Sequence, residues 1–272
     1  MIIDFHTHIF PDRIAQKTIE LLAQKADTAP YSDGTEAGLV QKAKDAGVNI
    51  CVALPVLTKP TQFSSVTAFA IGVNERYKTV KKGRILSFGG IHPRCDDIEG
   101  KMQYLKDNGF LGVKIHPDYQ QTEFDDEGYL RIIESAKRLD MIVVTHAGVD
   151  GAYRGETKCT PERVARVIDL IGHDKLVLAH MGGDEMFGEV YEKIAGKSVY
   201  LDTAFVLPTI SKAEFASIAE KHGTDKILFA TDSPWRDIKA EVARLDEFGL
   251  SMEDKDKILY KNALNLLGEE NL

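Results

Sequence analysis

Short, β-rich apolar runs alternate with longer amphipathic segments along this chain, and this alternation constrains the fold more than any other feature. The apolar runs are "IIDFH" (2–6), "NICVALP" (49–55), "RILSFGGIH" (84–92), "LGVKIH" (111–116), "MIVVTH" (141–146), "KLVLAH" (175–180), "SVYLDT" (198–203) and "KILFATD" (226–232). Helical patterns fall at 12–25, 36–46, 62–79, 99–108, 126–139, 160–171, 211–221, 237–248 and 253–267. Strands that are separated by helices indicate a parallel sheet of the α/β class.

The length of the chain favours a closed sheet. Eight β/α units within 272 residues fit a (β/α)8 TIM barrel. An open, doubly wound sheet is the alternative, but no glycine-rich G-x-G-x-x-G turn follows the first run. No linker-like segment or change of composition interrupts the pattern, so one barrel domain over residues 1–272 is expected.

Composition excludes several classes of function. The net charge is -8 and no basic stripe is present, so no nucleic-acid partner is expected. No apolar run reaches the length of about 18 residues that a membrane helix needs, and the N-terminus lacks the pattern of a signal peptide. Cys51, Cys95 and Cys159 are widely spaced, which is typical of reduced thiols. These features predict a cytoplasmic protein with neither a nucleic-acid nor a membrane partner.

Six histidines and one aspartate fall where predicted strands end. His6 and His8 are two residues apart, so both can point into the barrel. Later runs end in His92, His116, His146, His180 and Asp232. The active site of a barrel lies at these strand ends, and imidazole and carboxylate are the usual ligands of zinc and related ions. One such histidine alone is more often structural, but the convergence of six predicts a metal site.

Three other polar residues have roles that the pattern predicts less directly. His173 and His222 lie outside the strand ends and are expected to be structural, with His222 partly positive at the end of a helix. Because side chains alternate between the two faces of a strand, Asp4 is expected to point into the barrel like His6. It is expected either to accept the second N–H of a ligand histidine or to pair with Lys114.

Four segments together resemble a known group of enzymes. "DFHTH", "THAG", "AHMGG" and "TDSPW", with the late "YKNALNLLG" (260–268), are similar to the amidohydrolase superfamily and to its amidohydrolase-2 branch, which is related to aminocarboxymuconate-semialdehyde decarboxylase. The resemblance runs along essentially the whole chain. It implies that His6, His8 and His146 bind the metal, with Asp232 as a further ligand or as a base beside the metal-bound water. It implies that His180 is a catalytic base or orients the substrate. It also leaves a homodimer open, because relatives often dimerise.

The number and identity of the metal ions follow from the same resemblance. One divalent ion per chain is expected, most simply Zn²⁺, with Mn²⁺ as the alternative. The segment "GVKIHP" places Lys114 and His116 on one face. In binuclear members of the superfamily a lysine in this strand, as its carbamate, bridges two metals. Lys114, His116 and His92 are therefore candidates for a second metal or for substrate binding, although one metal is favoured over two.

Two reactions fit this set of residues. The first is hydrolysis of an amide, lactone or ester by a metal-activated water, whose pKa falls from about 15.7 toward about 7. Here Asp232 accepts a proton and His180 serves the leaving group. The alternative is non-oxidative decarboxylation of a small carboxylate, which needs a site for an anion. The candidates are Arg236, which is favoured, Arg94 and Arg154, with Tyr119 and Trp235 lining the pocket.

Two further hypotheses are less well supported. "DFHTH" followed by "YSDG" (31–34) resembles the PHP phosphoesterases, but the two segments are too far apart and strand two ends in "ALPVLT" instead of the expected "TDH". A non-catalytic metal-binding barrel is the other, because fold alone does not give function. The presence of both His180 and Asp232 beside three histidines argues against it, since a structural zinc site is usually closed by four protein ligands.

Overall fold

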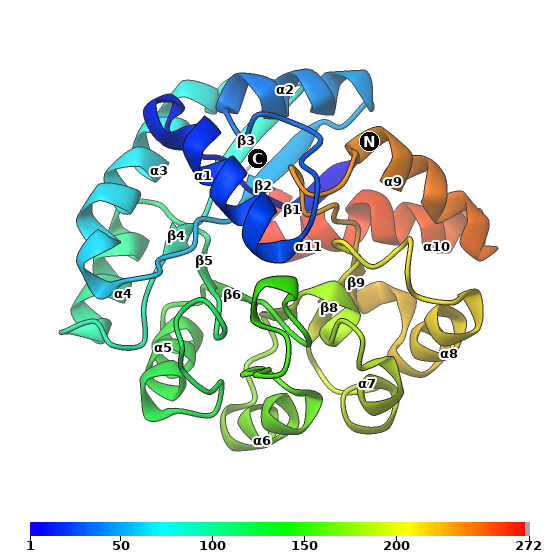
Figure 1. Ribbon diagram of the computed structural model, residues 1–272. Coiled ribbons are helices and arrows are strands. Elements are labelled where there is room, and N and C mark those ends of the chain that lie inside the picture. Colours follow the sequence, from blue (N-terminus) through cyan, green and yellow to red (C-terminus); the bar gives the residue numbers. More distant parts are fainter. Residues whose placement is uncertain (270–272) are drawn as a thin grey trace.

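Parallel strands occupy the middle of the molecule, and helices surround them (Figure 1). The structure is a computed structural model that describes residues 1–269. The strands are β1 (Ile3–Thr7), β2 (Ile50–Ala53), β3 (Arg84–Ser87), β4 (Gly89–Gly90), β5 (Gly112–Ile115), β6 (Ile142–Thr145), β7 (Leu176–Leu178), β8 (Tyr200–Asp202) and β9 (Ile227–Leu228). Every predicted apolar run therefore contains a strand.

The strands follow one another around a closed barrel. Their order is β1-β2-β3 and β4-β5-β6-β7-β8-β9, and each neighbouring pair is parallel. β3 and β4 are two parts of the run 84–92, interrupted at Phe88, whose N–H still donates to Ala53 O at 2.9 Å. β9 meets β1 where Phe5 N–H donates to Phe229 O and Asp232 N–H donates to His6 O, both at 2.9 Å. The predicted (β/α)8 barrel is confirmed.

Most helices begin and end close to the predicted positions. The segment predicted as one helix over 253–267 is instead divided by a π-helical turn (Lys257–Lys261), and the helix at 187–193 lies outside the nine predicted ranges. The helices are α1 (Asp12–Ala26), α2 (Glu36–Asp45), α3 (Phe63–Tyr77), α4 (Ile98–Asp107), α5 (Glu127–Arg138), α6 (Pro161–Ile171), α7 (Phe187–Lys193), α8 (Lys212–His222), α9 (Ile238–Arg244), α10 (Met252–Asp256) and α11 (Asn262–Leu267). Local capping explains several starts. The Thr160 side chain accepts the Arg163 N–H while Pro161 takes the first helical position of α6. Ser211 and Glu214 form a capping box at α8.

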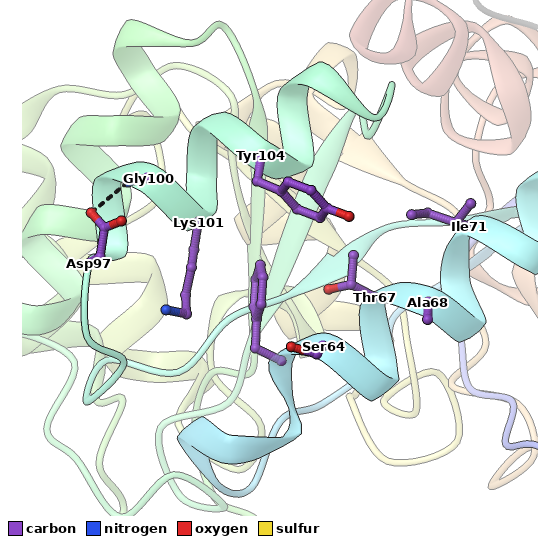
Figure 2. A pocket seen from close by; sticks show the side chains of 9 residues that line it. Ser64, Thr67, Ala68, Ile71, Asp97, Gly100, Lys101 and Tyr104 are labelled. Carbon is purple, nitrogen blue, oxygen red and sulfur yellow. Dashed lines mark hydrogen bonds between the residues drawn. The ribbon is translucent and has the colours of Figure 1, made fainter.

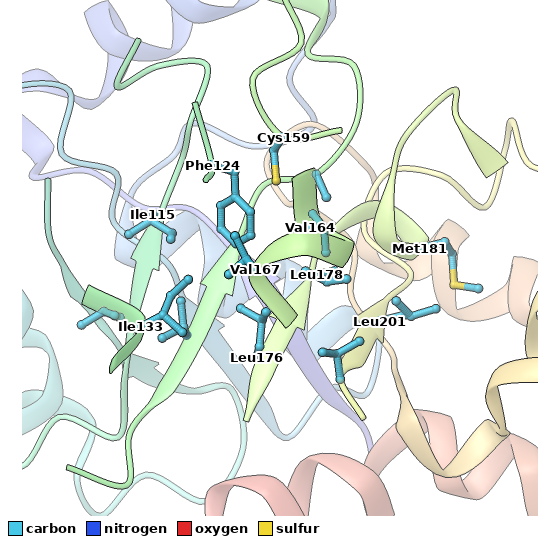
Figure 3. Close-up of a cluster of buried hydrophobic side chains, with 14 of the residues drawn as sticks. Ile115, Phe124, Ile133, Cys159, Val164, Val167, Leu176, Leu178, Met181 and Leu201 are labelled. Atoms are coloured by element: carbon cyan, nitrogen blue, oxygen red, sulfur yellow. The ribbon is translucent and has the colours of Figure 1, made fainter. Parts of the chain in front are cut away.

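Apolar side chains fill the space between the strands and the outer helices. Figure 3 shows Ile133 from α5 and Val164 and Val167 from α6 packed toward Leu176 and Leu178 of β7. All five are buried. Burial of each such side chain contributes about 1.5–3 kcal/mol to folding. The close packing holds the strands in fixed positions, and so it also fixes the residues at their C-terminal ends.

Two features bear on the expected cellular environment. Among residues 1–269, no helix is both long enough and apolar enough to cross a membrane. Cys51, Cys95 and Cys159 are buried and form no disulfide. Localisation and the single-domain organisation over residues 1–272 stay predictions, and residues 270–272 lie outside the described part of the chain.

Candidate active site

The C-terminal ends of the strands bring most of the predicted site residues together. His6, His146, His180 and Asp232 are all buried there. His180 and Asp232 also have positive φ angles of 59° and 65°, a region that side chains other than glycine rarely adopt. Backbone strain of this kind persists only where the surrounding structure enforces it, and it is concentrated at functional sites.

His6, His8 and Asp232 form the tightest group. The Nε2 atoms of His6 and His8 are 3.2 Å apart, and Asp232 Oδ1 lies 3.0 Å from His8 Nε2 and 3.5 Å from His6 Nε2. The other ring nitrogens face outward, where His6 Nδ1–H donates to Asp202 Oδ2 at 2.9 Å and His8 Nδ1–H donates to Leu54 O at 2.8 Å. A neutral histidine that donates from Nδ1 presents an electron pair at Nε2. Three acceptor atoms therefore converge within 4.8 Å, which fits a divalent metal ion.

Lys114 enters this group from the barrel interior. Its side chain is fully buried, and Nζ lies 3.1 Å from His6 Nε2. Burial lowers the pKa of Lys114 to about 8, against the opposing effect of Asp202. Asp4 was predicted to pair with Lys114 or to accept a ring N–H of a ligand histidine, and this prediction is wrong. The Asp4 carboxylate instead accepts the Thr231 hydroxyl at 2.6 Å and the Thr231 N–H at 3.0 Å. Whether one or two metal ions bind stays a prediction.

His180 and His146 lie beside the first group. His180 Nε2 is 2.9 Å from His146 Nδ1, and His180 Nδ1–H donates to Ala204 O at 2.8 Å. The His180 backbone N–H donates to Asp202 Oδ1 at 2.9 Å, so Asp202 contacts both His6 and His180. This carboxylate orients one residue from each of two strands.

A second group of possible ligands contains His116, His146 and Asp150. One ligand atom from each lies within 4.8 Å of the others. The His116 and His146 rings are stacked, with centroids 4.2 Å apart, and His116 Nε2 lies 3.4 Å from Asp150 Oδ2. Burial lowers the pKa of His116 and of His146 well below the usual value, which keeps both rings neutral. The structure thus places His146 in this second group, and its role as a ligand of the first metal stays a prediction.

Three candidates for substrate or metal binding are engaged elsewhere. His92 is buried outside both groups, and its Nδ1 accepts the Arg94 N–H at 3.1 Å. Arg94 forms an ion pair with Asp126 at 2.9 Å, and Arg154 forms one with Glu185 at 3.1 Å. Each guanidinium is thus paired with a carboxylate, and the role of either arginine in substrate binding stays a prediction.

Arg236 differs from these two arginines. Its Nε–H donates to Phe205 O at 3.1 Å, and its guanidinium carbon lies 3.7 Å from the centroid of the Phe205 ring. That ring is 6.4 Å from the His180 ring. Among residues 1–269 no carboxylate forms an ion pair with Arg236, so its terminal N–H groups can bind an anion at the edge of the site.

Two aromatic candidates also lie beside the site. The Tyr119 ring packs edge-on against His116, with centroids 4.6 Å apart, and contacts Tyr153 at 5.2 Å. Trp235 is half-buried and its backbone N–H donates to Asp232 O at 2.8 Å. Both positions agree with a role in lining the pocket, which stays a prediction.

Three carboxylates at the site were missed by sequence reasoning. Asp202 ends the run "SVYLDT", so its position at a strand end was a usable signal. Asp118 and Asp150 lie in loops shortly after His116 and His146. Loop conformation decides whether such residues turn toward the site, and no periodic pattern carries that information.

A separate hollow of about 420 Å³ lies on the outside of the barrel between α3 and α4. Figure 2 shows Thr67 and Ile71 of α3 facing Lys101 and Tyr104 of α4 across it. None of the candidate site residues lines this hollow. It is therefore distinct from the site at the strand ends.

Comparisons with known proteins agree with this fold. The sequence matches the family described as Amidohydrolase (Amidohydro_2) over residues 3–268. Three solved structures illustrate the similarity of fold. The first is an uncharacterized TIM-barrel protein from Bordetella bronchiseptica, with 17% identity, coverage of 100% of this chain and 99% of that chain, and a TM-score of 0.75. The second is a dihydroxybenzoic acid decarboxylase from Polaromonas sp. JS666 with bound manganese and the inhibitor 2-nitroresorcinol, with 17% identity, coverage of 100% of this chain and 98% of that chain, and a TM-score of 0.74. The third is 5-carboxyvanillate decarboxylase from Sphingomonas paucimobilis, with 15% identity, coverage of 98% of both chains and a TM-score of 0.69. No curated protein matches the chain.

Proposed function

The chain belongs to the amidohydrolase family, and from that premise we propose that it is a metal-dependent, non-oxidative decarboxylase of a small hydroxyaryl carboxylate. The observation that carries this proposal is the unpaired Arg236 guanidinium at the edge of a site built from His6, His8 and Asp232. The names of two structural neighbours support the reaction class, since they are decarboxylases of hydroxylated aromatic acids.

His6, His8 and Asp232 would hold the metal, because their acceptor atoms already converge. A divalent ion bound there supplies Lewis-acid stabilisation of negative charge on substrate oxygens. Imidazole and carboxylate ligands suit both zinc and manganese. One structural neighbour contains manganese, which makes Mn²⁺ a reasonable first choice for loading.

Arg236 would bind and orient the substrate carboxylate. Its position is fixed in two ways, by the Nε–H bond to Phe205 O and by the contact of the guanidinium with the Phe205 ring. The terminal N–H groups can then form a paired interaction with a carboxylate. A group that is already held in place loses little freedom on binding, so the substrate is positioned at small entropic cost.

His180 would give the proton that decarboxylation requires. When the bond between the ring carbon and the carboxylate breaks, the electron pair stays on the carbon, CO₂ leaves and the carbon takes up one proton. His180 Nδ1–H is held by Ala204 O, so a proton that His180 takes from water resides on Nε2, the nitrogen on the side of His146. Transfer of this proton from Nε2 to the ring carbon replaces the lost carboxylate with hydrogen and leaves His180 neutral.

Hydrolysis of a lactone, ester or amide is the second candidate, because Asp232 Oδ1 beside His8 is able to accept a proton from a water molecule. The sequence favoured this reaction. The free arginine and the named neighbours favour decarboxylation instead.

The test is a comparison of both reactions with one protein preparation. The Mn²⁺-loaded and Zn²⁺-loaded chain is incubated with dihydroxybenzoates and 5-carboxyvanillate, and CO₂ and the arene product are measured. Lactones and esters form a parallel panel. We expect CO₂ release that stops with a chelator and in Asp232→Asn. Turnover of lactones or esters without any CO₂ release would reject the decarboxylase and support the hydrolase.

A further inference from the structure

A buried oxygen of Asp118 and a buried ring nitrogen of His146 lie near each other, and neither has a hydrogen-bond partner within residues 1–269. Asp118 is 0% exposed, and its Oδ1 accepts the Lys158 N–H at 3.0 Å. Its Oδ2 lies 3.9 Å from His146 Nε2, and neither atom has a hydrogen-bond partner among the described residues. A buried polar atom without a partner is unfavourable, so this contact calls for an explanation.

The tautomer of His146 follows from a chain of contacts that begins at a backbone carbonyl. His180 Nδ1 lies 2.8 Å from Ala204 O, which can only accept, so this nitrogen carries the proton. A neutral His180 then has an electron pair on Nε2, 2.9 Å from His146 Nδ1. His146 must donate from Nδ1, and its Nε2 therefore turns an electron pair toward the Asp118 carboxylate. Two acceptors cannot bond, which agrees with the long separation of 3.9 Å.

The other tautomer reverses the situation. With the proton on Nε2, His146 can donate to Asp118, and both of those buried atoms are satisfied. The electron pairs of His146 Nδ1 and His180 Nε2 then face each other across 2.9 Å. This arrangement is unfavourable unless a metal ion binds the His146 Nδ1 electron pair, because imidazole nitrogens bind divalent metals through such electron pairs. The two tautomers are thus suited to a metal-free and a metal-loaded site.

We propose that Asp118 is a positioning residue of the metal centre, whose carboxylate accepts a hydrogen bond from His146 Nε2–H when metal binds and so directs the His146 Nδ1 electron pair toward the metal. This inference rests on the proposed metal-dependent function. Asp202 already acts in the same way on His6, with its Oδ2 accepting the Nδ1–H at 2.9 Å. Carboxylates that hold ligand histidines in one tautomer are a general feature of metal sites.

The first experiment reads the tautomer directly in the full chain. Long-range ¹H–¹⁵N correlation spectra of protein with ¹⁵N-labelled histidine separate the Nδ1–H and Nε2–H forms, and the His146 signals are identified by their loss in His146→Gln. Zn²⁺, which is diamagnetic, is added in steps. We expect His146 to change from the Nδ1–H to the Nε2–H form as Zn²⁺ binds. A zinc-loaded wild type that keeps the Nδ1–H form overturns the proposal, whatever any variant does.

The second experiment removes the carboxylate. Zn²⁺ affinity is measured by competition with a chromophoric chelator for wild type, Asp118→Asn and Asp126→Asn. The last is the matched control, because it makes the same change of charge at a carboxylate that pairs with Arg94 and belongs to neither group of possible ligands. We expect Asp118→Asn to lose about 10- to 100-fold in affinity and the control to change only a few-fold. Equal affinities for wild type and Asp118→Asn overturn the role of Asp118 alone. A wild type that binds no metal rejects the proposed function and this inference together.

Discussion

His8 Nε2 lies 3.0 Å from Asp232 Oδ1, and this contact joins the first strand of the barrel to the last. The same seam is bridged by the backbone, where His8 N–H donates to Ser233 O at 2.6 Å and Asp232 N–H donates to His6 O at 2.9 Å. Three of the predicted metal ligands, His6, His8 and Asp232, therefore lie on the two sides of the point where the barrel closes. A metal bound there connects two distant parts of the chain.

The double substitution His6→Ala/His8→Ala should abolish metal binding. We expect close to one metal ion per chain in the wild type after loading with Zn²⁺ or Mn²⁺, and almost none in the variant, because two of the three converging acceptors are lost. Elemental analysis of the purified protein gives the number. Free metal at 100 times its Kd should also raise the free energy of unfolding of the wild type by about 2.7 kcal/mol, an increase that the variant lacks.

His92→Ala is the control for this result. His92 is also a histidine at a strand end, but it lies outside both ligand groups and accepts the Arg94 N–H. Its loss should leave the metal content unchanged. Equal metal content in the double variant and the wild type would show that the ion binds elsewhere.

Asp202→Asn should weaken metal binding without preventing it. Asp202 accepts the His6 Nδ1–H and the backbone N–H of His180, so it holds one candidate ligand and the proposed proton donor in place. An amide offers only one acceptor atom for these donors, and we expect a loss of about 10- to 100-fold in Zn²⁺ affinity, measured by chelator competition. Asp4→Asn is the matched control, since Asp4 is equally buried but bonds to Thr231 and to the backbone N–H of His6 rather than to an imidazole ring. A larger loss for Asp4→Asn than for Asp202→Asn would show that this assignment of roles is wrong.

The roles of Asp4 and Asp202 show how far the sequence reaches. The alternation of runs predicted the barrel, and position at a strand end predicted the place of His6, His8, His116, His146 and His180 at the site, whereas His92 lies outside both ligand groups. The alternation also predicted that Asp4 points to the same side as His6, but the register of β1 shifts between Asp4 and Thr7, so the alternation does not hold from Asp4 to His6. The alternation of side chains along a strand does not predict which inward side chains meet across the barrel, because that depends on the tilt and stagger of the strands. Asp202 therefore contacts His6, and Asp4 bonds to Thr231 on the neighbouring strand end.

The arginines give a second example of this limit. Arg94, Arg154 and Arg236 all follow predicted strands, and the sequence offered only loop position to choose among them. Arg94 and Arg154 form ion pairs with Asp126 and Glu185, which are distant in the sequence. Surface ion pairs of this kind depend on how the loops pack, and the spacing of hydrophobic residues in the sequence does not predict loop packing. The preference for Arg236 agrees with the structure, although its role in binding stays a prediction.

Arg236→Ala should raise KM for a carboxylate substrate. A hydrogen bond to a charged group contributes about 1.5–3 kcal/mol, which corresponds to a rise of roughly 10- to 100-fold in KM. We expect kcat to fall less than KM rises, because Arg236 is placed to bind the carboxylate and not to transfer the proton. Steady-state kinetics of CO₂ release give both constants. Arg94→Ala, whose guanidinium is paired with Asp126, should leave KM within a few-fold of wild type. An unchanged KM in Arg236→Ala would exclude this anion site.

His222→Gln should reduce the loss of stability in acid. His222 lies at the end of α8, where Nε2–H donates to Val199 O at 3.1 Å and Nδ1 accepts the Gly196 N–H at 3.2 Å. Burial lowers its pKa to about 4, so the predicted partly positive imidazole is wrong. The unfolded chain, with a pKa near 6.5, binds this proton more readily, so the contribution to stability is complete above pH 6.5 and is lost as pH falls toward 4. Between pH 7 and pH 5 the loss should be about 2 kcal/mol. Urea denaturation at pH 7 and pH 5 gives the free energy of unfolding at each pH. The decrease between the two pH values should be smaller in His222→Gln than in the wild type by about that amount. An identical pH dependence in the two proteins would mean that His222 is not neutral in the folded state.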